Sequence, residues 1–90
     1  AEAEKIGLVN RVVEPDQLMA EVEKMAEKIK AKGPVAISVA KIAINTGANT
    51  DLFSGLAVER LAQTVALATE DKIEGMTAFI EKRKPEFKGK

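Results

Sequence analysis

The sequence predicts an all-α fold of about four helices, with a short strand before them. Apolar residues make up 46% of the 90 residues but aromatic residues only 3%, so a core has to be built from Ala, Val, Ile, Leu and Met. Such a composition favours packed helices. Apolar residues also recur at helical spacing in four successive segments, which Gly and Pro separate.

The first thirteen residues predict the end of one helix followed by a strand. Residues 1–5 have a helix-forming composition, the chain begins without Met, and Gly7 follows, as is common just beyond a helix C-terminus. Residues 8–13 are short and rich in β-branched side chains, which is typical of a strand. A strand needs a partner, so we expect residues 1–13 to be the remnant of a sheet-containing domain that precedes Ala1.

Two helices are predicted between residues 15 and 46. The first begins near Pro15 and has one apolar stripe, interpreted as core, and one charged, solvated face. The second runs from Pro34 to about Thr46 and is apolar nearly all round, so we expect it to be mostly buried. The stripe of the first helix comprises Leu18, Met19, Val22, Met25, Ala26 and Ile29.

The third helix, from about Leu52 to Ala68, has two apolar stripes and is expected to pack on two sides. Thr50 or Asp51 is its expected N-cap. Glu59 is an acid among apolar neighbours, and we interpret it as a structural group, paired where helices pack, in preference to a catalytic one.

A fourth helix is predicted from the N-cap Thr69 to about Arg83. Gly75 interrupts it, which indicates either a close approach of another backbone or a locally weak helix. Pro85 prevents continuation, and the polar tail that follows, with its single aromatic Phe87, is either frayed or an anchored arm.

Composition excludes several classes of function. Lys plus Arg and Asp plus Glu both number 14, and Cys and His are absent. The chain therefore has no thiol or histidine nucleophile system, and no metal site is expected. The basic residues at 81–90 lack interleaved aromatic residues, so we expect no nucleic-acid partner. Without a long apolar run we expect no membrane span, and a cytoplasmic location.

The order of several short motifs resembles the C-terminal third of the crotonase (enoyl-CoA hydratase/isomerase) family. These motifs extend over almost the whole chain, and the greatest similarity is to bacterial short-chain enoyl-CoA hydratases, also called 3-hydroxybutyryl-CoA dehydratases. The motifs are residues 6–13, Pro15, residues 33–36, Ala40 with Lys41, Glu59 and residues 69–87.

The resemblance implies a longer subunit, with an N-terminal spiral of ββα repeats and a C-terminal helical region that builds trimers and often hexamers. Residues 1–13 would be a remnant of the spiral, and residues 14–90 would form the helical region that assembles subunits and completes the acyl-CoA pocket. Family hydratases use two glutamates and two backbone N–H groups of the spiral, which are expected to precede Ala1. We therefore expect no catalytic residue in this chain, and no cofactor beyond the CoA thioester substrate.

The same resemblance implies that Phe79 lines the acyl or pantetheine channel and that Lys82 reaches the phosphate or adenine end of CoA held mainly by a neighbouring subunit. An ammonium group is a suitable point charge for a phosphate, and the forked donors of Arg83 could assist. Judged by residue type alone, Phe79 is more typical of a core position, and Lys82, Arg83 and Lys84 complement the negative end of a helix dipole.

The predicted function is thus that of the C-terminal part of an enoyl-CoA hydratase, which hydrates 2-enoyl-CoA reversibly to 3-hydroxyacyl-CoA. Two alternatives stay open. The same segment occurs in isomerases, thioester hydrolases and dehalogenases of the family, and a stand-alone helical interaction module is possible. The predicted orphan strand and the two-faced third helix argue against the independent module.

Overall fold

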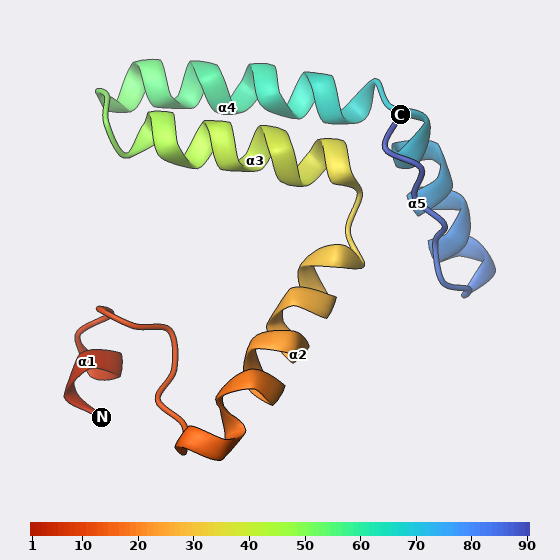
Figure 1. Cartoon of the computed structure of the whole chain (residues 1–90). Coiled ribbons are helices and arrows are strands. Elements are labelled where there is room, and N and C mark those ends of the chain that lie inside the picture. Colours follow the sequence, from red (N-terminus) through yellow and green to blue (C-terminus); the bar gives the residue numbers. More distant parts are fainter.

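The computed structural model describes all of residues 1–90 and confirms an all-α fold (Figure 1). The four long helices begin and end within a few residues of their predicted bounds. The elements are α1 (Glu2–Lys5), the 3-10 helix η1 (Pro15–Gln17), α2 (Leu18–Lys30), α3 (Pro34–Gly47), α4 (Leu52–Leu67) and α5 (Glu70–Glu81).

The strand predicted at residues 8–13 is wrong for this chain, because no strand is present. The backbone of this segment forms local hydrogen bonds instead. The N–H groups of Leu8 and Val9 donate to the Ala3 carbonyl at 2.8 and 3.3 Å, and the N–H of Val12 donates to a carboxylate oxygen of Glu4 at 3.3 Å. A ladder needs a second strand, and none lies beside these residues.

Side-chain caps fix the starts of the last two helices as the sequence indicates. Of the two candidates before α4, Asp51 is the cap, and its carboxylate accepts the Ser54 N–H at 3.0 Å. Thr69 caps α5, and its hydroxyl accepts the Lys72 N–H at 3.1 Å. Each cap satisfies one of the free N–H groups of a helix N-terminus.

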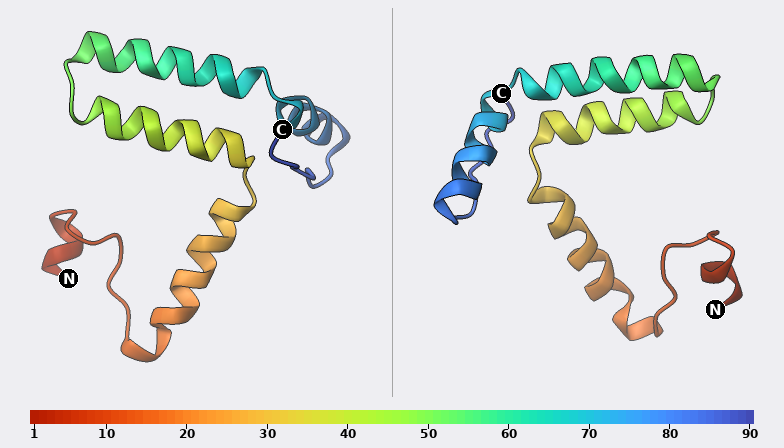
Figure 2. Two further views of the ribbon diagram at one scale, coloured as in Figure 1. Left: turned by 45° about the horizontal axis from the view of Figure 1, so that its top comes forward. Right: turned by 180° about the vertical axis from the view of Figure 1, so that it is seen from behind.

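The chain is open in shape. Helices α3 and α4 lie side by side and antiparallel, whereas α2 and α5 diverge from one end of this pair (Figures 1 and 2). The radius of gyration is 16.6 Å, against about 12 Å for a compact domain of this length. The accessible surface is 7617 Å², against roughly 5,100 Å² for a compact protein of this mass. Only Gly33, Asp71 and Ala78 are buried.

The α3–α4 pair is the one extensive helix–helix contact. On α3 the half-buried side chains that face it include Val39 and Ala43, and on α4 they include Ala62 and Ala66. Small residues let two helices approach closely, and Gly55 is the extreme case. A Cβ on Gly55 would lie 3.3 Å from the Gly47 Cα.

Two predictions of burial are wrong for this chain. Helix α3 is mostly exposed, with Ile42 at 56% and Ile44 at 70%, because α4 covers only one side of it. The apolar stripe of α2, which includes Met19 and Met25, is exposed as well. Both stripes of α4 also remain largely uncovered, since α3 packs along the small residues between them. The apolar pattern is therefore correct, but this chain lacks the layers that would cover it.

Candidate functional site

The candidate ligand residue Phe79 lies on α5, beside an apolar pocket. The pocket has a volume of about 480 Å³ and is formed by the start of α3, the end of α4, α5 and the C-terminal segment. Phe79 is 85% exposed, so the structure does not place it in a core. Apolar lining residues beside it are Ala36, Ala66, Leu67, Met76, Ile80 and Phe87.

Lys82 follows α5 directly and has a left-handed backbone, with φ of 55° and ψ of 39°. Two hydrogen bonds close the helix end around it: the Arg83 N–H donates to the Ala78 carbonyl at 3.0 Å, and the Lys82 N–H donates to the Phe79 carbonyl at 3.3 Å. This is the Schellman motif, in which Gly is usual at this position. A side chain here costs about 1 kcal/mol.

Lys82 is exposed and lies outside the pocket lining, and its side chain makes no hydrogen bond or ion pair. It is three residues beyond Phe79, so the structure brings the two candidates to the same end of α5. The ammonium group is free to meet an anion that approaches this end.

Arg83 is not free in this way. Its two terminal nitrogens donate to the two carboxylate oxygens of Glu74 at 2.6 and 2.9 Å, and its Nε donates to Glu81 at 2.6 Å. These contacts raise the pKa of Arg83, chiefly through the bond to Glu74. The forked donors that the sequence suggested for a phosphate are therefore already used by carboxylates.

Residues 84–90 form an arm that returns along α5, which settles the choice between a frayed tail and an anchored arm (Figures 1 and 2). The buried Asp71 carboxylate accepts the N–H groups of Lys88 and Gly89 at 2.7 and 2.8 Å, while the Asp71 N–H donates to the Lys90 carbonyl at 3.0 Å. Glu74 also accepts the Glu86 N–H at 2.8 Å. We call residues 84–90 the C-terminal arm.

The ring of Phe87 packs close to the glycine inside α5. A Cβ on Gly75 would lie 3.4 Å from the ring, and one on Gly33 would lie 3.8 Å from it. An aromatic ring, and not another backbone, therefore approaches Gly75. Asp71 and Glu74, which anchor the arm, are residues that sequence reasoning missed. No side-chain pattern in the sequence signals these contacts, because the partners of the two carboxylates are backbone N–H groups.

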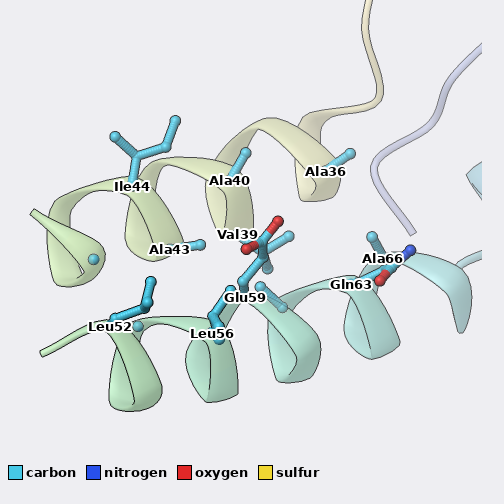
Figure 3. A pocket seen from close by; sticks show the side chains of 13 residues that line it. Ala36, Val39, Ala40, Ala43, Ile44, Leu52, Leu56, Glu59, Gln63 and Ala66 are labelled. Carbon is cyan, nitrogen blue, oxygen red and sulfur yellow. The ribbon is translucent and has the colours of Figure 1, made fainter.

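A second hollow lies between α3 and α4, with a volume of about 620 Å³ (Figure 3). Its lining is mainly apolar, and the Glu59 carboxylate points into it, with Gln63 one turn further along α4. The side chain of Glu59 is exposed and makes no hydrogen bond or ion pair within the chain. The pairing predicted for Glu59 is thus not made by any residue of this chain.

These two hollows can bind apolar groups, but they do not assemble a reaction centre. No group of three or more His, Cys, Asp or Glu residues is arranged to hold a metal ion. General acid–base chemistry needs a positioned donor and acceptor, and Glu59 is the only carboxylate in the α3–α4 hollow. No helix has the length and apolar character required to cross a membrane.

Comparison with known proteins identifies the family of this chain. The family model described as enoyl-CoA hydratase/isomerase matches residues 1–90. A crotonyl-CoA hydratase of Syntrophomonas wolfei is 48% identical over 86 residues, which cover 96% of this chain and 33% of the relative. A short-chain-enoyl-CoA hydratase of Clostridium acetobutylicum is 49% identical over 85 residues, 94% of this chain and 33% of the relative. The chain thus spans about a third of the length of these curated relatives.

The solved structures agree. An enoyl-CoA hydratase from Bacillus anthracis superposes with a TM-score of 0.95 at 43% identity, over 99% of this chain and 34% of that one. The open arrangement of α2, the α3–α4 pair and α5 is therefore the arrangement that such a segment has within a longer enzyme. The resemblance stated from the motifs is confirmed, and the chain belongs to the enoyl-CoA hydratase/isomerase family.

Proposed function

We propose that this chain is the helical portion of an enoyl-CoA hydratase, that it serves subunit assembly, and that it completes the acyl-CoA site without being catalytic alone. The observation that carries this proposal is that the whole chain matches about one third of the length of each hydratase. The exposed apolar helix faces and the free Lys82 are what such a portion would need.

Support for assembly comes from the surface. The accessible area exceeds that of a compact protein by about 2,500 Å². Covering this area on both sides of a contact would bury about 5,000 Å² in total, which is the size of a large permanent interface. Large exposed side chains include Leu52 at 79%, Leu61 at 67% and Leu67 at 54%, all on α4. Apolar area of this extent indicates contact surfaces. We propose that it is covered by the remainder of the subunit and by further copies, as a trimer or hexamer.

Support for CoA contact comes from α5. Phe79 offers an exposed ring beside an apolar pocket, which suits the acyl or pantetheine part, and Lys82 offers an unpaired ammonium group for the phosphate or adenine end. We propose that both act in trans, on CoA held mainly by a neighbouring subunit. Lys82 occupies a position where Gly would be less strained, and a strained conformation is a reason to look for a functional role.

The reaction proposed for the complete protein is the syn addition of water across the double bond of a 2-enoyl-CoA, or the reverse. The hydroxyl group adds to C3 and a proton to C2, so the step needs an acid–base pair and stabilisation of the enolate. We propose that those groups lie outside this chain, and that no metal or redox cofactor takes part. The cytoplasm is the proposed compartment, which fractionation of the source cells would test.

The test is kinetic and uses the complete protein with crotonyl-CoA. Lys82→Ala should raise KM about tenfold with kcat nearly unchanged, because an anchoring charge–phosphate contact is lost. Phe79→Ala should raise KM by about threefold. The matched controls are Lys84→Ala and Phe53→Ala. Equal KM values for Lys82→Ala and the unaltered protein would remove Lys82 from the site.

A second candidate is an isomerase of the same family, since the family description includes both activities, and a Bacillus subtilis relative 48% identical is named a putative enoyl-CoA hydratase/isomerase. Assaying the complete protein with 2-enoyl-CoA and 3-enoyl-CoA substrates separates the two. An independent interaction module is disfavoured, because only three residues are buried in this chain. A concentration-independent, cooperatively folded monomer would favour that module.

A further inference from the structure

The C-terminal arm is attached to α5 by two acidic residues that none of the roles above requires. Asp71 and Glu74 are three residues apart and therefore share one face of the helix. Together they accept three backbone N–H groups of the arm, from Glu86, Lys88 and Gly89, at 2.7 to 2.8 Å. Carboxylates that accept several N–H groups form strong, directional anchors.

Glu74 has the more central position of the two. Its carboxylate binds the Arg83 guanidinium on one side of Pro85 and the Glu86 N–H on the other side. The reversal at Lys82 is consequently fixed on both flanks, by the end of α5 before it and by the Glu74 contacts just after it. Packing of Phe87 beside Gly75 holds the arm against the same face.

The side chain of Lys82 contributes nothing that would hold this geometry. Its side chain has no partner, and its left-handed backbone is one that a residue with a Cβ adopts only when its surroundings impose it. The surroundings that impose it are the two helix-end hydrogen bonds and the arm. Without the arm, only the two helix-end hydrogen bonds would hold the backbone at Lys82, and the direction of the ammonium group would be less firmly fixed.

We infer that Glu74 is a positioning residue for CoA recognition: by fastening Arg83 and the C-terminal arm it fixes the left-handed turn from which Lys82 extends. Asp71 secures the far end of the same arm. This inference rests on the proposed contact between Lys82 and CoA, and it assigns to Glu74 no contact with the ligand.

The experiment is a double-mutant cycle in the complete protein, with the dissociation constant of acetoacetyl-CoA as the readout. Lys82→Ala should weaken binding about tenfold. Glu74→Gln should weaken it about threefold in the unaltered background, and hardly at all when Lys82 is already Ala, because the two changes act through one contact. Glu81→Gln is the matched control, since Glu81 binds Arg83 but no backbone group of the arm, and it should leave binding unchanged.

The outcomes separate the two proposals. If Lys82→Ala weakens binding but Glu74→Gln either has no effect or has the same effect in both backgrounds, the positioning role is overturned and the Lys82 contact stands. If Lys82→Ala leaves binding unchanged, the Lys82 contact with CoA and the positioning role of Glu74 are both overturned. Thermal unfolding checks that Glu74→Gln is folded; should it not fold, Asp71→Asn replaces it in the same cycle, with the same criteria.

Discussion

Gly55 of α4 lies directly against Gly47 of α3, so closely that a Cβ on Gly55 would come within 3.3 Å of the Gly47 Cα. The neighbouring atom belongs to the backbone and cannot rotate away. The two glycines therefore set the distance between α3 and α4 at the end of the pair where the connecting turn lies.

Gly55→Leu should therefore destabilise the α3–α4 pair. Overpacking of a tight contact costs about 1 to 3 kcal/mol, which outweighs the gain of up to about 1 kcal/mol in helix propensity. The measurement is the midpoint of thermal unfolding by circular dichroism. Ala57→Leu, at an exposed position of the same helix, is the control, and equal midpoints for both variants would show that the contact is unimportant.

Release of the C-terminal arm at low pH should follow the titration of Glu74. The bond from Arg83, and then the Glu86 N–H, lower the pKa of Glu74 from 4.5 to about 2. A lowered carboxylate pKa gives stability that is present above pH 4.5 and is lost as the pH falls towards 2. Hydrogen exchange of the Glu86 amide should accelerate in that window, relative to its intrinsic rate, and a constant protection factor down to pH 2 would contradict the assignment.

Phe87→Ala should loosen the arm, because the ring is the only large side chain of residues 84–90 that packs against Gly75 and Gly33. The ring is half-buried, so the expected loss is about 1 to 2 kcal/mol, less than for a core phenylalanine. Trypsin should then cut faster after Lys88. Phe53→Ala makes the same chemical change at a residue that is 85% exposed and should leave the cutting rate as it was.

The 90-residue chain on its own should self-associate. Its exposed apolar area has no cover within the chain, and burial of such area is the main driving force for association. Sedimentation velocity over a hundredfold range of concentration should show a rising average mass. Replacing Leu61, which is 67% exposed on α4, with Glu should shift the association to higher concentration. A single monomer peak throughout would refute the assembly role.

The helices and caps could be predicted from the sequence because their causes are local. Pro34, Asp51 and Thr69 act within one turn, and a period of 3.6 residues is visible without any partner. Burial could not be predicted. The apolar stripe of α2, which contains Met19, indicates that these side chains pack against something, but not whether the partner surface belongs to this chain. The strand at residues 8–13 failed for the same reason.

In the candidate site, too, some residues could be named from the sequence and others could not. Phe79 and Lys82 are site candidates only through the family resemblance, and the structure adds that the ring of Phe79 is exposed beside a pocket and the side chain of Lys82 is unpaired. Asp71 and Glu74 escaped notice because their partners are backbone N–H groups 12 to 18 residues away. No pattern of side chains along the chain records such a contact.

The α3–α4 pair also bears on the order in which structure forms. Its two helices are joined by a turn of only four residues, so the contacts between them are local in sequence, and local contacts form within microseconds to milliseconds. Helices α2 and α5 have little to dock against until other surfaces arrive. Slow steps in the maturation of this protein should therefore lie in the docking of α2 and α5 on surfaces outside these 90 residues, and not in the pairing of α3 with α4.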